Sequence, residues 1–473
     1  MIMQRDEIFE MTVTDISTSG DGIGRIDGMV TFVPGLIPGD TADVRITALK
    51  KNIARGVIEE IKEFSPDRTE PRCSCFGRCG GCQLQNMTYE AQIRLKERQL
   101  KDRLERLYGG ELPEFDKPCV TDNPWFYRNK AEYAVSAGGI KEDRKGGLKN
   151  TGSLRVGFYD RSSHHVTDVR NCMIQSEAAD MAAYGLRRYI SESGISVYDE
   201  KTRRGRLRRM VVKVSPATGE VMIILVINGK KLKDPQLLAD IMDEAVTGDY
   251  YLASIAAEYN SHRDISVPGK FEIIAGADVI RDSAGGLEFE ISPQSFYQVN
   301  SETTEKLYNT VLEYADPGQD DTVFDLYCGT GTIGLFCARQ AGYVWGIESV
   351  EQAVLNANRN AVINGIVNIQ FINGKAEEKI FELEERGIMP DVVIMDPPRS
   401  GCRPELLDAV VKSAPSRIVY VSCEPSTMAR DLRLLAGPDS RYRVERVRLI
   451  DQFSQTIRLE ACCLLTKSDG SRG

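Results

Sequence analysis

The stretch that decides the fold of this chain is VFDLYCGTGTIGL, residues 323–335. Its first half is an apolar run that predicts a buried β-strand, and its second half leads into a helical pattern. The glycines between them let the backbone turn tightly and approach a ligand where a Cβ atom would clash. A strand, a Gly-rich turn and a helix in this order are typical of a βαβ unit that binds a nucleoside cofactor.

An acidic residue follows this turn at the distance that such a cofactor requires. Glu348 comes directly after the apolar strand 343–347, where its carboxylate could accept both ribose hydroxyls. This spacing serves a dinucleotide as well as S-adenosylmethionine (SAM), and a tight turn without a ligand is the plainer alternative. Strands alternate with helical stretches from here to the end, so we expect residues 289–473 to form a Rossmann-like α/β domain.

Two further strands end in residues that distinguish between these cofactors. Residues 391–399 read DVVIMDPPR, which places Asp396 at the carboxyl edge of the sheet, where open α/β sheets bind their ligands. An Asp-Pro-Pro edge resembles SAM-dependent methyltransferases and not dehydrogenases. The apolar strand 417–421 delivers Cys423 to the same edge, where a thiol is placed for nucleophilic attack.

A second set of cysteines lies near the N-terminus and has the spacing of a soft-metal site: Cys73, Cys79 and Cys82. The first ten residues hold no secretion signal, and no apolar stretch approaches the roughly 18 residues of a membrane span. We therefore expect a cytoplasmic protein, whose 12 cysteines serve as thiols, metal ligands or catalysts and not as a disulfide scaffold.

The first 62 residues predict a small β-barrel, because short alternating strands are separated by Gly-rich turns. They resemble the TRAM domain, an OB-like RNA-binding module. Lys50, Lys51 and Arg55 are candidate phosphate contacts, although a solvated strand face explains each of them equally well. The net charge of -9 does not exclude a nucleic-acid partner, since binding depends on where positive charge collects.

Residues 63–288 predict a mixed α+β domain with antiparallel hairpins. A helix over 90–108 is expected to pack on the catalytic domain through one apolar stripe. The stripe consists of Ile93, Leu100, Leu104 and Leu107. Further on, residues 201–209 hold six cations, which would neutralise phosphates if they shared a face. A solvated loop is the equal alternative for this basic run.

Taken in order, the segments of this chain resemble the RNA uracil-5-methyltransferases, a family that includes ribosomal-RNA and transfer-RNA enzymes. The resemblance covers nearly the whole chain, and each segment is modest alone, whereas the ordered set is highly specific. The matching segments are the barrel, the cysteines at 73–82, YRNK at 127–130, GFY at 157–159, NC at 171–172, SPQSFYQVN at 292–300, the Gly-rich loop, DPPR at 396–399 and VSC at 421–423.

The resemblance implies a four-iron four-sulfur cluster, which takes four thiolates and can take the fourth from far along the chain. Its expected ligands are Cys73, Cys79, Cys82 and Cys172. Zinc is the rival metal, and the shorter cysteine spacing of radical-SAM enzymes is absent. Transfer of a methyl cation requires no electron, so we expect a structural role. Cys75 matches no ligand position, and six further cysteines are expected in hydrophobic cores: Cys119, Cys328, Cys337, Cys402, Cys462 and Cys463.

The resemblance also implies the chemistry. Carbon 5 of uracil is too weakly nucleophilic to attack SAM unaided, so a thiolate first adds to carbon 6 and generates an enolate. Cys423 is the expected nucleophile, and Glu460 the expected base that removes the proton from carbon 5. Phe296 is a candidate aromatic face for the extruded uracil, or a core residue. The positions that match cofactor contacts are Gln298, Tyr327, Glu348 and Asp396.

The chain departs from the family pattern where Ser454 replaces the usual Pro and Arg458 the usual His. These departures bear on loop geometry and target choice. Family members with both a TRAM domain and a cluster resemble the ribosomal-RNA enzymes, so the expected substrate is 23S rRNA, with tRNA as the alternative. An iron-sulfur methylthiotransferase would not need the C-terminal Gly-rich loop, and a non-catalytic RNA-binding protein would need neither Cys423 nor Glu460. No obligate protein partner is implied.

Overall fold

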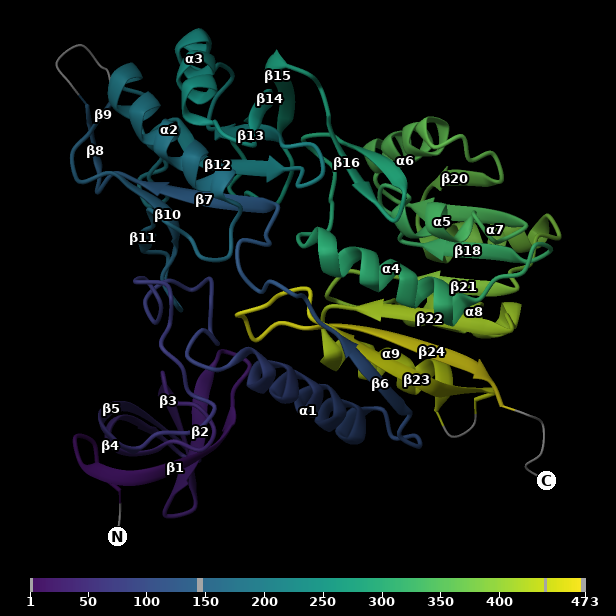
Figure 1. Cartoon of the computed structure of the whole chain (residues 1–473), viewed down its shortest axis with the longest axis horizontal. Coiled ribbons are helices and arrows are strands. Elements are labelled where there is room, and N and C mark those ends of the chain that lie inside the picture. Colours follow the sequence, from purple (N-terminus) through teal and green to yellow (C-terminus); the bar gives the residue numbers. More distant parts are fainter. Residues whose placement is uncertain (1–2, 143–147, 438–439, 469–473) are drawn as a thin grey trace.

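The computed structural model describes residues 3–142, 148–437 and 440–468. It contains a closed barrel at the N-terminal end, a large sheet in the central region and a second large sheet in the C-terminal region (Figure 1). Two small hairpins complete the described strands: β8 (Ile140–Glu142) with β9 (Leu148–Asn150), and β16 (Ile280–Ala284) with β17 (Leu287–Ile291). None of the helices in the described residues is long and apolar enough to span a membrane.

The N-terminal strands close into a barrel, which confirms the predicted OB-like module. The strand order is β1 (Ile8–Ile16), β2 (Asp21–Ile26), β3 (Met29–Pro34), β5 (Ile53–Glu63) and β4 (Thr41–Lys50). Alternate residues of β4 point inward, as a half-buried strand requires. Gly56 is needed where the strands approach closely, since a Cβ atom there would lie 2.2 Å from Val44. Lys50 and Lys51 are exposed, whereas Arg55 lies 4.0 Å from the carboxylate of Asp21.

Helix α1 (Tyr89–Leu107) connects the barrel to the C-terminal region. Leu100 and Leu104 are fully buried against the C-terminal core, as the stripe predicts, but Leu107 is 40% exposed. The prediction for Leu107 was wrong because Tyr108, the next residue, occupies the buried place and donates a hydrogen bond to the Ala436 carbonyl over 2.9 Å. The N-terminal half of the helix packs instead on the barrel, through the buried residue Leu95.

The central sheet has the order β11 (Val166–Asp168), β10 (Arg155–Tyr159), β7 (Lys130–Ser136), β12 (Leu207–Val214), β13 (Glu220–Ile227), β14 (Tyr251–Tyr259) and β15 (Lys270–Gly276). Helices α2 (Glu177–Ser193) and α3 (Pro235–Ala245) bury their apolar faces on it. The strands β13 and β14 are parallel, so the sheet is mixed and not antiparallel as expected. Helix α3 explains the difference, because it supplies the crossover that joins two parallel strands.

The C-terminal sheet has the order β20 (Ile369–Asn373), β19 (Tyr343–Glu348), β18 (Thr322–Leu326), β21 (Val392–Met395), β22 (Arg417–Ser422), β24 (Glu460–Lys467), β23 (Tyr442–Ile450) and β6 (Glu114–Cys119). The first five strands are parallel, which confirms the Rossmann-like prediction. The last strand, β6, reaches this sheet from the segment before the central sheet and pairs in parallel with β23.

Helices cover both faces of the C-terminal sheet (Figure 1). One face carries α4 (Ser301–Ala315), α5 (Thr332–Cys337) and α6 (Glu351–Ile363), and the other carries α7 (Ala376–Glu385), α8 (Pro404–Ser413) and α9 (Pro425–Ala436) together with α1. The cysteines predicted for this core are buried, with the exception of the half-buried Cys119. Because both faces are covered, functional side chains are confined to the edge where the parallel strands end.

Candidate active site

The carboxyl ends of four parallel strands bring together the residues that the sequence singled out. Tyr327 follows β18, Glu348 ends β19, Asp396 follows β21 and Cys423 follows β22. All four line one cavity of about 870 Å³. The other predicted site residues line it too: Gln298, Glu460, Phe296, Cys73, Cys79, Cys82 and Cys172. The fold therefore gathers every residue of the predicted site around a single space.

One part of this cavity has the backbone of a nucleoside site. The Glu348 carboxylate accepts hydrogen bonds from the N–H of Gly329 at 3.2 Å and of Val350 at 2.8 Å, which fix its orientation beside the Gly-rich loop. Gly331 has φ +80°, and a Cβ atom there would lie 2.5 Å from the ring of Phe371. Only glycine meets both conditions, so the loop can hold its open turn against the neighbouring strand.

Buried carboxylates lie beneath and beside this loop. Asp325 is 1% exposed, and burial raises its pKa to about 8. Burial also raises the pKa of Asp396 to about 6. The two carboxylates raise each other's cost of ionisation, so this edge of the sheet favours a ligand that brings positive charge. A sulfonium is such a ligand.

The opposite part of the cavity holds the thiol and a buried acid. Strands β22 and β24 pair so that Ser422 lies opposite Ala461, and the next residues along the two strands are Cys423 and Glu460. Burial raises the pKa of Cys423, the charge of Glu460 raises it further and Arg399 opposes both. Glu460 is 3% exposed, and burial raises its pKa well above the usual range, with the charge of Asp396 adding to the effect.

The cysteine wall of the cavity is built from two distant segments. The N–H of Gly81 donates to the Cys79 sulfur at 3.4 Å, and the N–H of Cys172 donates to Asp180 at 2.7 Å, so both segments are held by their backbones. Four thiols that line one cavity suit an iron–sulfur cluster by donor chemistry. Within the described residues, however, no three ligating side chains stand close enough together to hold a metal ion.

Cys75 lies outside the cavity, as expected from the sequence, and the neighbouring pair of histidines, His164 and His165, lies at the surface. The Cys75 thiol donates to the Asp168 carbonyl over 3.8 Å and does not line the cavity. His164 and His165 are exposed, and His165 contacts Asp160 at 3.0 Å. These residues form part of the outer surface next to the cysteine wall.

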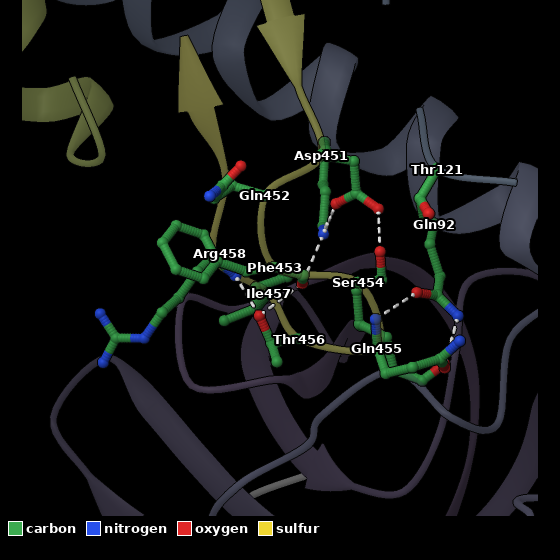
Figure 2. Close-up of polar contacts among 12 residues, drawn as sticks. Gln92, Thr121, Asp451, Gln452, Phe453, Ser454, Gln455, Thr456, Ile457 and Arg458 are labelled. Atoms are coloured by element: carbon green, nitrogen blue, oxygen red, sulfur yellow. Dashed lines mark hydrogen bonds and ion pairs between the residues drawn. The ribbon is translucent and has the colours of Figure 1, made fainter. Parts of the chain in front are cut away.

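The loop between β23 and β24 carries both departures from the family pattern (Figure 2). The hydroxyl of Ser454 donates to Asp451 at 2.7 Å, and the carbonyl of Ser454 accepts from Tyr127 at 2.9 Å. The next residue, Gln455, exchanges two hydrogen bonds of 3.0 Å with Gln92 of α1. Serine thus fixes by hydrogen bonding a turn that proline would fix by its ring.

Arg458 points away from this hydrogen-bonded network (Figure 2). It is exposed, and its side chain makes no ion pair with the residues that the structure describes. Partial burial and the charge of Arg399 lower its pKa, while Cys423 opposes them. Arg458 therefore adds positive charge beside the thiol, at the position where the family usually has a histidine.

Some residues around the cavity were assigned no role from the sequence. Arg128 and Arg399 line it and lie within electrostatic range of Arg458. The Nε atom of Arg128 is buried and has no hydrogen-bond partner in the described chain. The segments YRNK and DPPR contain both arginines, so their chemistry was visible in the sequence, but only the fold brings them to one place.

The basic run at 201–209 does not form a single cationic face. Arg208 is 7% exposed, stacks on Tyr198 at 4.7 Å and donates to the His262 carbonyl at 2.7 Å. Arg209 forms an ion pair with Glu132 at 3.0 Å. Lys201, Arg203, Arg204 and Arg206 are exposed, so four of the six cations of the run are at the surface.

The loop of Figure 2 leads to one prediction on stability. Lys96 of α1 forms an ion pair with Asp451, and neither side chain is exposed at all. Substitution Lys96→Met would leave the Asp451 carboxylate buried without a counter-charge, so we expect the free energy of unfolding to fall by about 3–5 kcal/mol. Urea denaturation followed by tryptophan fluorescence and circular dichroism measures this loss.

Lys101→Met is the matched control for this prediction, because Lys101 lies on the same helix and is exposed. It should change the unfolding free energy by less than about 0.5 kcal/mol. An equal effect of both substitutions would show that the buried ion pair does not hold α1 to the loop.

The Rossmann-like sheet, its Gly-rich loop and the acids at its carboxyl edge define a SAM-dependent methyltransferase. The family model of tRNA (Uracil-5-)-methyltransferases matches residues 279–468, and the TRAM domain model matches residues 4–58. A protein of Clostridium tetani described as an uncharacterized RNA methyltransferase is 40% identical over 98% of this chain and 97% of its own length. One of Halalkalibacterium halodurans is 38% identical over 98% of both. The chain belongs to the RNA uracil-5-methyltransferase family.

A solved structure covers nearly the whole chain. The tRNA (uracil-54, C5)-methyltransferase of Pyrococcus abyssi in complex with S-adenosyl-L-homocysteine has a TM-score of 0.74 and 27% identity, over 96% of this chain and 99% of that one. The resemblance inferred from the sequence motifs is confirmed. The chain is a SAM-dependent RNA methyltransferase whose fold is that of a uracil-5-methyltransferase.

Proposed function

We propose that this protein transfers a methyl group from SAM to carbon 5 of a uridine in 23S rRNA through a covalent cysteine–uracil intermediate. The observation that carries the proposal is the placement of Cys423 and Glu460, which lie next to the Ser422–Ala461 pair at adjacent strand ends, in one cavity with Asp396 and Glu348. A nucleophile and a base beside a nucleoside site are what methylation of an unreactive carbon requires.

In the proposed reaction, the Cys423 thiolate adds to carbon 6 of uracil, and the electrons of the carbon 5–carbon 6 double bond pass to the enolate. Carbon 5 then attacks the methyl group of SAM, and S-adenosylhomocysteine leaves. Glu460 takes the remaining proton from carbon 5, the double bond re-forms and the thiolate leaves carbon 6. Atoms and charges balance without an oxidant or a reductant.

The environment of Glu460 suits this last step. Burial and Asp396 raise the pKa of Glu460, so its carboxylate is a stronger base than an exposed one. Arg399 lowers the cost of keeping that carboxylate charged, and it also stabilises the Cys423 thiolate. We propose that this arginine lets both groups carry negative charge in turn.

We propose that four residues contact SAM: Gln298, Tyr327, Glu348 and Asp396. The fixed carboxylate of Glu348 has lone pairs left for the ribose hydroxyls. The carboxylate of Asp396, which lines the same cavity, would offset the positive charge of the sulfonium. Phe296, 64% exposed on the cavity wall, is placed to stack on an extruded base.

We infer that Cys73, Cys79, Cys82 and Cys172 hold a four-iron four-sulfur cluster with a structural role. The support is the donor set: four thiols from two segments line one cavity within electrostatic range of one another, and they would draw closer together on binding the cluster. When bound, the cluster would cross-link the segment around residue 79 to the segment around residue 172. Iron and acid-labile sulfide contents of anaerobically purified protein test this inference, and a stoichiometric zinc content without sulfide would overturn it.

A second substrate, tRNA, is favoured by a specific observation. The Pyrococcus abyssi enzyme, whose structure resembles this one over its full length, is described as acting at uracil 54 of tRNA. We favour 23S rRNA because the chain combines a TRAM barrel with the cysteine set. Either RNA would place the protein's activity in the cytoplasm.

Nucleoside mass spectrometry separates these substrates. Unmodified 23S rRNA and bulk tRNA are incubated separately with anaerobically purified protein and SAM, and 5-methyluridine is quantified. We expect the product in rRNA and none with Cys423→Ala. Product in tRNA alone would leave the chemistry standing and refute the proposed substrate, and no product in either RNA would refute the proposed function.

A further inference from the structure

A buried lysine of the central sheet contacts the catalytic region at one loop. Lys213 lies on β12 and is 6% exposed. Its ammonium donates to three carbonyl oxygens of a single turn: those of Ser292 at 2.8 Å, Pro293 at 3.1 Å and Ser295 at 2.7 Å. It forms no ion pair with any described residue. All donor capacity of this side chain is therefore spent on the backbone of that turn.

The same turn is held from the other side by the catalytic domain. The side-chain amide of Asn356, on α6, donates to the hydroxyls of Ser292 at 3.0 Å and Ser295 at 2.7 Å. The turn also closes on itself, since the N–H of Ser295 donates to the Ser292 carbonyl at 3.2 Å. Residues 292–295 are thus clamped between the central sheet and helix α6.

The segment directly after the clamped turn enters the reaction cavity. Phe296 and Gln298 both belong to this segment, and both line the cavity. Gln298 is held further by its carbonyl, which accepts a hydrogen bond from Asn129 at 2.9 Å. Phe296 directly follows the turn, and Gln298 follows two residues later, after Tyr297, whose side chain is buried. A shift of the turn would therefore move both cavity residues.

Burying the Lys213 ammonium costs free energy, which argues that its directed hydrogen bonds to the turn have a purpose. An ammonium buried without a counter-charge loses its hydration, and an apolar side chain would fill the same space without that loss. Burial lowers the pKa of Lys213 to about 7, with the charge of Lys130 acting in the same direction and Glu132 opposing them. Three directed hydrogen bonds to one turn are what the lysine adds over an apolar residue.

We propose that Lys213 is a positioning residue for methyl transfer, which fixes the turn 292–295 so that Phe296 and Gln298 project into the cavity in the geometry that binds SAM and the target base. It couples the central sheet to the active-site edge of the catalytic sheet. The inference deepens the proposed function, and it rests on that function only for the parts played by Phe296 and Gln298.

SAM binding to the RNA-free protein tests the proposal, because it requires neither the correct RNA nor the covalent step. We expect Lys213→Met to raise the Kd for SAM about tenfold, as the loss of roughly one charge-assisted hydrogen bond predicts. Isothermal titration calorimetry measures it. Lys270→Met, which replaces an exposed lysine on β15 of the same sheet, is the matched control and should keep the wild-type Kd.

Two further readouts separate positioning from a merely structural part. Lys213→Gln keeps a neutral donor and should recover part of the affinity that the Met variant loses. Relative to Lys213→Met, wild-type affinity should fall as pH rises through about 7, because the ammonium then loses a proton and with it one donor. Asp325 and Asp396 titrate in every variant, so the difference between variants isolates the lysine.

Three results would overturn the proposal. The first is a Lys213→Met variant that binds SAM within twofold of wild type. The second is a Kd for SAM that changes with pH in the same way in wild type and in Lys213→Met. The third is loss of the fold in both the Met and the Gln variant, which would make Lys213 a residue required for folding. Failure of the proposed function would instead leave the SAM-binding results intact and remove only RNA methylation.

Discussion

Replacing Cys423 by alanine is expected to abolish methylation of RNA, with a loss of at least about 10⁴-fold in kcat, while the Kd for SAM stays within twofold of wild type. Without the thiolate, carbon 5 has no enolate electrons with which to attack the methyl group. RNA that contains 5-fluorouridine gives an independent readout, because fluorine at carbon 5 cannot leave as a proton and the adduct persists. Wild type should form this adduct on denaturing gels, and the variant should not.

Cys119→Ala is the control for this experiment, since Cys119 is a half-buried cysteine of β6 at the far end of the same sheet. It should retain both methylation and adduct formation. An adduct in Cys423→Ala would assign the nucleophile to another residue.

The pH dependence of the wild type is set by the same thiol. Burial and the charge of Glu460 raise the pKa of Cys423, so only a small fraction is thiolate at neutral pH. The thiolate is the reactive form, and kcat/KM should therefore keep rising with pH beyond the ordinary thiol pKa of about 8.5. Removing the opposing charge by Arg399→Met should move this rise to higher pH. A rate that is flat over this range would contradict the assignment.

The parts of the fold that depend on residues close together in the sequence could be predicted. The stretch 323–335 contains its own strand, turn and helix, and they appear as β18 and α5. Parallel strands end at one edge, so residues placed after separate strands, such as Asp396 and Cys423, could be expected to meet. The spacing of short strands around Gly-rich turns likewise predicted the closed barrel.

The parts that depend on pairing between distant segments could not be predicted. Lys96 and Asp451 lie far apart in the chain, and a lysine within an amphipathic helix normally faces solvent. The exposure of Leu107 also depends on distant segments, because the buried side of α1 packs partly on the C-terminal core and partly on the barrel. The sequence of the helix does not show where one contact ends and the other begins. Lys213 is a third case, since its contacts are to backbone carbonyls, which carry no side-chain signature.

Replacing Glu460 by glutamine is expected to stop the reaction one step later than Cys423→Ala. Glutamine keeps the shape of the side chain but accepts no proton at carbon 5, so turnover should fall by about 10²–10⁴-fold. Addition of the thiolate should not be slowed, because the charge of Glu460 raises the pKa of Cys423 and its removal favours the thiolate. The protein should therefore accumulate bound to ordinary RNA, without any fluorinated base.

Mass spectrometry of the trapped complex distinguishes this outcome from simple inactivity. Nuclease digestion should leave a uridine nucleotide on the peptide that contains Cys423, and that nucleotide should already carry the transferred methyl group. Glu405→Gln, at an exposed position of α8, should show normal turnover and no trapped species. A trapped nucleotide without the methyl group would mean that Glu460 acts before methyl transfer. Free 5-methyluridine at the wild-type rate would mean that another base removes the proton, and Asp396, whose charge acts on Glu460, would be the candidate.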